Sequence, residues 1–566
     1  DAGRRAPRYE GEDTSETTEQ ELRGWYLYGL AAEVFAVCGV GSFLPVTLEQ
    51  LAKENAVLWS DKTTSCKTKP PGEDTNASTV MRLFARAGER DDTQCVIHLF
   101  GAEITTSSFA MYTFSLAVFI QALALVSFSS VADHGHYRKK LLTAFGFTGA
   151  IASMLFILIV PKVYLLGPLL VVIGVTCLGS SFVLLNSFLP VLVANHPSIR
   201  NRVSRFNNES SSIPLESLSG NLESAENGPF APATTQVKST MAELQLSAKI
   251  SSKGVGIGYC AAVFVQVLSI ILLWGLSKTK ASSTLPLRLV LFIVGLWWFV
   301  FTIPTALYLR PRPGPPLTTS SKPGRLRALF TYLSFAWISL FRTIKLAFQL
   351  RQMVIFLVAW FLLSDAVATV SGTAILFART ELHMGTVSIA LLSITATGSG
   401  IAGAFLWPIL SSRFRLPTNQ TIVACILLME IIPLYGLLGY IPFIQSWGVG
   451  GMQKAWELYP LGFVHGFVMG GLSSYCRSFF GLLIPPGSEA AFYALYAITD
   501  KGSSAVGPAV VGVIVDRVGS IRPAFIFLAI LIALPAPMIW IVDVKKGQGD
   551  ALRMAGLIGK AGDTDT

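Results

Sequence analysis

The stretch from Gly24 to Thr47, GWYLYGLAAEVFAVCGVGSFLPVT, decides the fold class of this chain. It is long enough to cross a bilayer, for which a helix needs about 20 apolar residues. Glu33 nevertheless lies near its middle, and a carboxylate at membrane depth costs roughly 2.5 kcal/mol or more unless protein or water surrounds it. We therefore expect a membrane-spanning helix that lies inside a bundle and turns its acidic side toward a cavity.

The composition supports a membrane protein. Of the 566 residues, 52% are hydrophobic and 14% are charged, whereas soluble domains have about 25% charged residues. The net charge of +10 could suggest a nucleic-acid partner, but the basic residues gather in short stretches between apolar segments. That distribution follows the positive-inside rule of membrane proteins, so we expect the lipid bilayer and not nucleic acid as the partner.

Long apolar runs recur along the chain and predict an all-α membrane protein with twelve transmembrane helices. The predicted segments are 24–48, 107–131, 141–160, 164–194, 242–277, 287–309, 353–377, 386–410, 420–441, 456–484, 490–515 and 521–543.

The basic loops predict the orientation of these helices. With an even number of spans, both termini lie on one side of the membrane. The loop 132–140, with Arg138, and the stretch 310–351, which has basic but no acidic residues, fall on that same side. We therefore expect both termini to be cytosolic.

The long loop 49–106 then faces the opposite, lumenal side. It contains Cys66, Cys95 and an N-glycosylation sequon at Asn76. A disulfide and a glycan both need such a compartment, so we expect both modifications. The alternative is two free cysteines and an unused sequon.

The polar stretches define the predicted domain organisation. Residues 196–238 are rich in Ser, Asn, Glu and Pro and predict a disordered cytosolic insert. Apolar and basic residues at helical spacing in 326–350 predict an amphipathic helix on the membrane surface, with a short extra span as the alternative. The predicted parts are a tail at 1–23, a first half at 24–309, a linker at 310–352, a second half at 353–543 and a tail at 544–566.

An internal repeat relates the two halves. An aromatic residue precedes a buried acid by five positions at both Glu33 and Asp365, six segments apart. Weaker echoes pair the glycine-rich stretches after Lys253 and Lys501, and the Ser-rich segments that contain Asn186 and Arg477. These pairs favour two pseudo-symmetric six-helix halves, the arrangement of major facilitator transporters, with a central site between them.

Several strings carry a family resemblance. The loop 132–140, an acid followed by a basic cluster, resembles the loop between helices 2 and 3 of major facilitators, although its counterpart at 411–415 lacks the acid. The strings at 24–52, 250–262, 361–370 and 483–508 are similar to the fungal autophagy-related vacuolar amino-acid effluxers, a divergent branch of the major facilitator superfamily. The resemblance covers 24 to about 545. It implies a vacuole membrane protein that returns neutral amino acids, leucine among them, to the cytosol after autophagic breakdown.

The buried polar residues suggest how such a solute is held. A neutral amino acid is a zwitterion and needs an acid, hydrogen-bond donors and an apolar wall in a low-dielectric cavity. Glu33 and Asp365 are the candidates for its ammonium group, and Arg477 or Lys501 for its carboxylate. The remaining candidates are Tyr26, Tyr28, Phe492 and Tyr496 for the wall, and Asn186 for a neutral hydrogen bond.

The same residues have structural alternatives. The two acids can lock helices together by pairing with basic side chains, and Arg477 can pair with Glu489 as a gate latch. His465 can relay protons or be an ordinary core residue. The residues expected to form gates or ion pairs are Asp133, Arg138, Glu489, Asp500 and Lys253.

We expect alternating access, in which the halves rock about the central site, with proton binding at Glu33 or Asp365 as a further hypothesis. No nucleotide-binding, zinc-protease or hydrolase motif occurs, so we expect neither an enzyme nor a cofactor or metal. The alternatives are a carrier for a drug, peptide or lysolipid, and a non-transporting scaffold that recruits partners through 196–238.

Overall fold

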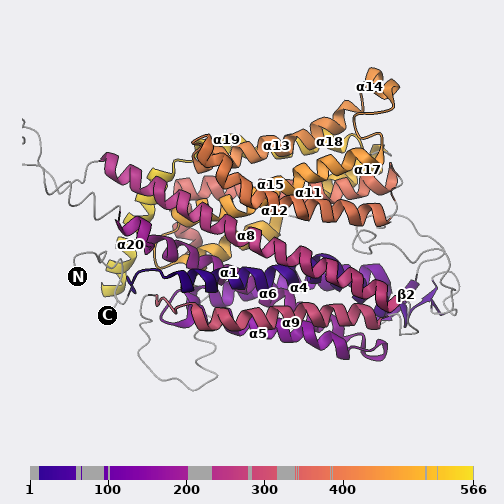
Figure 1. Ribbon diagram of the computed structural model, residues 1–566, viewed down its shortest axis with the longest axis horizontal. Coiled ribbons are helices and arrows are strands. Elements are labelled where there is room, and N and C mark those ends of the chain that lie inside the picture. The colour runs from indigo at the N-terminus through magenta and orange to yellow at the C-terminus, as the bar shows by residue number, and fades with distance from the viewer. Residues whose placement is uncertain are drawn as a thin grey trace, which may run out of the picture.

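A computed structural model describes most of the chain, and all structural statements below refer to that part. The described residues are 12–58, 65–66, 95–99, 102–201, 233–277, 284–314, 338, 341, 343–382, 384, 386–503, 506–518 and 521–564. Nearly all of them are helical, and the long helices run side by side (Figure 1). Helices of the first half gather on one side of the bundle, and those of the second half gather on the other.

The first half contains six long helical segments. They are α1 (Glu19–Val34), continued by η1 (Phe35–Phe43) and α2 (Leu44–Lys53); α4 (Thr106–Ala132); α5 (Tyr137–Met154), continued by η4 (Leu155–Leu158); α6 (Leu166–Ala194), after the short η5 (Pro161–Val163); α8 (Ala233–Ser277); and α9 (Leu285–Tyr308).

The second half contains the corresponding segments. They are α11 (Arg351–Thr380), α12 (Thr386–Arg413), α13 (Thr418–Leu438), α15 (Leu458–Leu483), α16 (Glu489–Ser503) with α17 (Val506–Val518), and α18 (Ala524–Ala533) with α19 (Pro535–Ile541). The short α14 (Pro442–Trp447) and η7 (Ala455–Glu457) precede α15, and α20 (Val544–Thr564) ends the described chain.

The predicted all-α membrane fold is confirmed, and the count of twelve spans stays a prediction. Ten helical segments of the described chain are long and apolar enough to cross a membrane. The predicted segments 456–484 and 490–515 are also helical but are not among those ten. In the second of them α16 ends at Ser503 and α17 begins at Val506, and residues 504–505 lie outside the described chain.

Three sequence predictions fall largely outside the described residues. They concern the insert at 196–238, the amphipathic helix at 326–350 and the sequon at Asn76. The described chain resumes with α8 at Ala233, within the range of the predicted insert, whose disorder stays a prediction.

The first helix starts with a side-chain cap and changes its pitch midway. Thr18 accepts a hydrogen bond from the backbone N–H of Glu21, as expected of a helix N-cap. Immediately after Glu33 the helix passes into the π-helix η1, which contains two of the glycines in the opening stretch. Such π segments occur frequently at functional sites.

Small residues allow the closest helix pair of the second half. A Cβ atom on Gly403 of α12 would lie 2.0 Å from the carbonyl oxygen of Phe467, and one on Gly470 of α15 would lie 2.2 Å from that of Gly400. Membrane helices use small residues in this way because close backbones gain van der Waals contact that lipid does not offer.

A three-stranded antiparallel sheet lies at the end of the bundle opposite α20 (Figure 1). It consists of β1 (Val57–Leu58), β2 (Cys95–Leu99) and β3 (Ala102–Thr105). Cys66 and Cys95, predicted to pair, form a disulfide beside it.

The two halves meet along a small number of helices. In the first half α8 packs against α12 and α15, and α4 and α6 pack against α16. Gly256 of α8 allows one of these contacts, since a Cβ atom there would lie 2.6 Å from the ring of Phe405. This boundary is where the candidate site lies.

Candidate functional site

Arg477 of α15 reaches from the second half into the first. Its Nη1 donates a hydrogen bond of 3.0 Å to Asn186 Oδ1 of α6. Its Nε and Nη2 donate to the hydroxyl of Ser251 on α8, at 2.9 and 2.7 Å. Ser251 in turn donates to the carbonyl oxygen of Ser474, 3.0 Å away, so a polar network joins three helices across the boundary.

An aromatic ring lies against the same guanidinium. The carbon centre of the Arg477 guanidinium lies 5.5 Å from the ring centre of Trp25, within the range of a cation–π interaction. Trp25 is held by a 2.9 Å hydrogen bond from its indole N–H to the carbonyl oxygen of Leu185. The planar group of Arg477 is thus held by the Trp25 ring on one face and by hydrogen bonds at its edges.

Glu33 lies near Arg477 without forming an ion pair with it. The positive charge of Arg477 acts on the Glu33 carboxylate, and Tyr259 of α8 interacts with both charges. In the part of the chain that the structure describes, no salt bridge joins Glu33 and Arg477, and part of the Glu33 surface stays accessible. Two groups of opposite charge from different halves therefore act on each other without direct contact.

Glycines on α8 make room for the site on α1. A Cβ atom on Gly258 would lie 2.9 Å from the Cβ of Glu33, and one on Gly254 would lie 2.5 Å from the ring of Trp25. The glycines after Lys253 are therefore positions of close helix packing.

Asp365 has a different environment from Glu33. It is buried in the second half, and its Oδ1 accepts a 3.0 Å hydrogen bond from the backbone N–H of Gly507, in the first turn of α17. A Cβ atom on Gly507 would lie 1.9 Å from the hydroxyl of Thr369, which shows how closely α17 approaches α11. Asp365 therefore caps a helix within its own half, which is the structural alternative to a role in substrate binding.

The predicted aromatic wall is only partly accessible. Tyr28 and Phe492 have no exposed surface and pack in the cores of the first and second halves, so we correct their assignment as wall residues. Tyr496 is nearly buried and stacks on Trp360 at 4.7 Å between ring centres. Tyr26 keeps exposed surface, and Lys253 lies 5.2 Å above its ring.

Lys501 is the remaining basic candidate for the substrate carboxylate. The side chain of Lys501 lies outside the described residues, although its backbone belongs to α16. Its neighbour Asp500 accepts a 2.5 Å hydrogen bond from the hydroxyl of Ser364 on α11.

A buried ion-pair cluster joins the halves at the end of the bundle that holds α20. Nη2 of Arg138 lies 3.1 Å from Asp133 Oδ1 and 2.9 Å from Glu489 Oε2, and all three side chains are at most 4% exposed. We call these three residues the latch. Arg138 and Asp133 belong to the first half, and Glu489 begins α16 in the second.

Asp133 also binds the start of α16. Its two carboxylate oxygens accept hydrogen bonds of 2.7 and 2.8 Å from the backbone N–H groups of Ala490 and Ala491. A carboxylate at a helix N-terminus satisfies N–H groups that have no partner within the helix and interacts favourably with the helix dipole. The sequence hypothesis that Arg477 pairs with Glu489 is wrong, since Glu489 pairs with Arg138.

The search for charged residues missed three members of the site. Trp25, Ser251 and Tyr259 are uncharged, and only the structure places them against Arg477 and Glu33. All three lie within the strings 24–52 and 250–262 that carried the family resemblance. Only their place in these strings marked them, because Ser251 and Tyr259 lie on α8 and not on the helix of Glu33.

Comparison with known proteins identifies the family. A family model described as "Vacuole effluxer Atg22 like" matches residues 17–552. The chain belongs to this family. It is 63% identical to Autophagy-related protein 22-1 of Sclerotinia sclerotiorum over 565 residues, which are 98% of this chain and 94% of that protein. It is 58% identical to Autophagy-related protein 22-1 of Aspergillus clavatus over 580 residues, which are 99% and 94% of the two chains.

Solved structures show the same fold at low sequence identity. The human organic anion transporter MFSD10 (TETRAN) matches with a TM-score of 0.52 and 14% identity, over 92% of this chain and 99% of that one. A bacterial homologue of the iron transporter ferroportin matches with a TM-score of 0.51 and 13% identity, over 92% and 98%. This member of the Atg22-like family is a multi-pass vacuole membrane transporter with the major facilitator fold.

Proposed function

We propose that this transporter moves neutral amino acids, leucine among them, from the vacuole lumen to the cytosol by alternating access. The observation that carries the proposal is the pair Glu33 and Arg477. These opposite charges come from different halves, act on each other and form no salt bridge in the described chain. A zwitterion fits between such groups because it presents one charge to each of them.

The hydrogen-bonding capacity of Arg477 agrees with this substrate. Its Nη1 donates one N–H group to Asn186, and no described residue accepts the other one. A guanidinium forms strong, charge-assisted bonds with carboxylates, so the remaining donor suits the substrate carboxylate. Glu33 is then the partner of the substrate ammonium group, and the accessible Tyr26 ring, on the same helix, contributes an apolar surface.

The latch suggests which side of the transporter is closed. The basic loops predict that the end holding both described chain ends is cytosolic. Under that orientation the latch closes the cytosolic side, and release of an amino acid requires Arg138 to separate from Glu489. The rocking of the halves would break this contact once in each cycle.

Proton coupling is a further part of the proposal, and Glu33 is its candidate site. A carboxylate that faces a substrate ammonium group can carry a proton when the substrate is absent. Proton binding and substrate binding at that carboxylate are then linked. If Glu33→Gln proteoliposomes transport leucine with an unchanged pH dependence, protons do not act through Glu33.

Counterflow in proteoliposomes that contain only this protein tests the substrate class. We expect preloaded leucine to drive uptake of labelled leucine. Leucinol lacks the carboxylate and 4-methylpentanoate lacks the ammonium group, so neither should compete with leucine. Transport of these analogues at rates similar to leucine would contradict a two-charge site. No counterflow from active, folded protein would contradict amino-acid transport itself.

A further inference from the structure

Arg312 is a buried basic residue outside the candidate site, near the start of the predicted linker between the halves. Its side chain is 1% exposed, and its backbone lies in the left-handed region, with a φ of 31°. Few residues other than glycine adopt such a backbone, and those that do are held there by their surroundings, often in switch regions. The contacts of Arg312 therefore decide where this part of the chain lies.

The N-terminal segment supplies those contacts. Nε and Nη2 of Arg312 donate hydrogen bonds of 2.8 and 2.7 Å to the two carboxylate oxygens of Glu21, whose side chain has no exposed surface. Nη1 donates to the backbone carbonyl oxygens of Asp13 and Ser15, at 3.1 and 2.8 Å. A bidentate pair of guanidinium and carboxylate is strong and fixes the geometry of both groups. Arg312 thus joins the segment 12–18 and the first turn of α1 to the beginning of the linker.

Two residues farther along, the same piece of chain lies against the latch. The backbone N–H of Gly314 donates a 2.9 Å hydrogen bond to the carbonyl oxygen of Gly135, in the loop 133–136 between α4 and α5. The chains are so close that a Cβ atom on Gly314 would overlap the carbonyl oxygen of Asp133. Asp133 belongs to the latch, and its side chain binds the start of α16. The backbone that carries this carboxylate therefore rests on Gly314.

We propose that Arg312 is a positioning residue for the latch. Glu21 holds Arg312, and Pro313, whose ring restricts its backbone, passes the constraint to the next residue. Gly314 then fixes the backbone from which Asp133 reaches the second half. The N-terminal segment is thereby part of the closed state of the transporter. The inference rests on the closing role proposed for the latch and does not depend on which solute is carried.

The reactivity of one introduced cysteine measures the state of the latch. Ser488→Cys places a thiol next to Glu489, in the full-length protein with the exposed Cys260 replaced by Ala. Its rate of reaction with a water-soluble maleimide is compared between variants in detergent. Arg312→Gln should raise this rate about fivefold, as Arg138→Gln should also do. Such a factor corresponds to a shift of about 1 kcal/mol in the equilibrium between the closed and the open latch.

Matched variants localise the effect to the path through the linker. Arg310→Gln is the control for the charge, because Arg310 is exposed and its bond to the Ser15 hydroxyl is 3.4 Å long. Gly314→Ala tests the same path without loss of a charge, and should also raise the rate because the methyl group pushes the linker away from the loop 133–136. Gly549→Ala is its control, since no atom lies within 4 Å of a Cβ there. Should Arg312→Gln fail to fold, Gly314→Ala still decides.

A double variant separates positioning of the latch from a merely structural role. If Arg312 acts through the latch, R138Q/R312Q should react no faster than R138Q alone. If the two residues stabilise the protein independently, the two factors should multiply.

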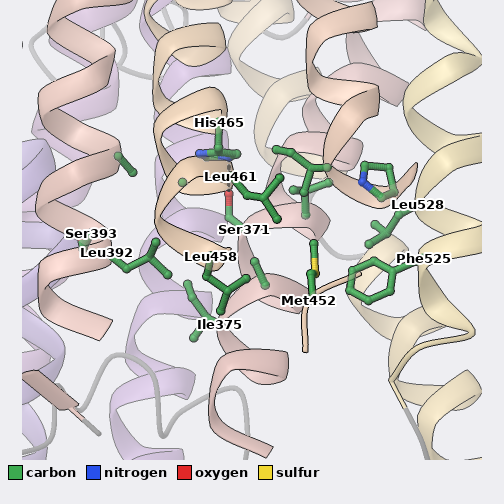
Figure 2. A pocket seen from close by; sticks show the side chains of 16 residues that line it. Ser371, Ile375, Leu392, Ser393, Met452, Leu458, Leu461, His465, Phe525 and Leu528 are labelled. Carbon is green, nitrogen blue, oxygen red and sulfur yellow. Dashed lines mark hydrogen bonds between the residues drawn. The ribbon is translucent and has the colours of Figure 1, made fainter. Parts of the chain in front are cut away.

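A contact far from the latch controls for general loosening of the bundle. Figure 2 shows Ser371 and His465 meeting beside a cavity in the second half, with 3.0 Å between the Ser371 hydroxyl oxygen and Nε2 of His465. Ser371 lies about 20 residues, or roughly 30 Å, along α11 from the end that contacts α20. Ser371→Ala should lower the unfolding temperature and leave the reaction rate of the introduced cysteine unchanged.

The outcomes distinguish this inference from the proposals on which it rests. A faster rate in R138Q with unchanged rates in R312Q and G314A would overturn the inference and leave the latch intact. Multiplied effects in the double variant would also overturn it. An unchanged rate in R138Q itself would contradict the closing role of the latch and the inference together. Loss of leucine counterflow with these rates as expected would contradict only the proposed substrate.

Discussion

Arg477 and Asn186 form a 3.0 Å hydrogen bond that joins the two positions paired by the internal repeat. One lies on α15 and the other on α6, so corresponding segments of the two halves meet at this bond. The pair is nevertheless unequal, because only one member is charged. A site built on this inequality can distinguish the carboxylate end of a substrate from its ammonium end.

Replacing Arg477 with Lys tests the importance of this geometry. Lysine keeps the charge, but its donors lie on one nitrogen and cannot reproduce the spread of Nε, Nη1 and Nη2 toward Ser251, Asn186 and a substrate. We expect leucine counterflow to fall by about tenfold or more, as one charge-assisted hydrogen bond is lost. The control is Arg413→Lys at an exposed position of α12, which should have no effect. Unchanged counterflow in R477K would contradict the proposed role.

Removal of the latch cation should open the side of the protein that it closes. Arg138→Gln leaves Asp133 and Glu489 buried without their positive partner, which costs about 3 to 5 kcal/mol in comparable sites. We expect faster reaction of a cysteine introduced beside Glu489 with a water-soluble maleimide.

The control for the latch is Arg23→Gln. Arg23 pairs with Glu19 at 3.5 Å, with side chains 70% and 88% exposed, so its loss should not change cysteine accessibility. Equal accessibility in R138Q and the unchanged protein would show that the latch does not hold this side closed.

Asp365 should matter for stability rather than for substrate charge. Asparagine can still accept the hydrogen bond from Gly507, whereas alanine cannot. We expect D365N to retain leucine counterflow, and D365A to lower the free energy of unfolding by about 0.5 to 2 kcal/mol, as for other helix caps. Thermal unfolding in detergent measures the second effect. Loss of counterflow in folded D365N would instead support binding of the ammonium group.

The close approach of α8 and α1 should not tolerate a side chain at Gly258. A Cβ atom there would lie 2.9 Å from the Cβ of Glu33, so Gly258→Val should displace Glu33 and abolish leucine counterflow. Gly275→Val is the matched control on the same helix, because no atom lies within 4 Å of a Cβ there. If both variants transport leucine equally well, the spacing of these helices is not critical.

The sequence predicted the membrane fold and pointed to one residue as a candidate for the site. A segment in lipid must satisfy its backbone hydrogen bonds internally, so each span is one continuous apolar helix. Hydropathy locates such continuous runs. Glu33 could be identified because a carboxylate within an apolar run needs a specific environment. Arg138, Asp133 and Glu489 were predicted as gate or ion-pair residues, and the structure joins them in ion pairs whose partners were not predicted. Their action as a gate stays a prediction.

The remaining details depend on contacts between distant segments. Periodicity does not determine the rotation of a helix in the bundle, so Tyr28 and Phe492 were placed on a wall although they lie in cores. Asp365 matches Glu33 in the repeat, but its partner is the backbone N–H of Gly507, 142 residues away in the sequence, and hydropathy does not reveal such a contact.

The π-helix that follows Glu33 has a consequence for tolerance of insertions and deletions. A π segment results when one residue is added to an α-helix, and each residue of an α-helix turns its successor by about 100°. Loss of one residue between Phe35 and Phe43 would therefore restore regular winding and leave Glu33 and α2 in about the same relative orientation, because the extra residue is absorbed within this segment. Loss of one residue between Glu33 and α2 without such absorption would rotate the acid by roughly 100° relative to the far end of its own helix. A single lost codon should thus be tolerated in this short segment and not elsewhere in the opening span.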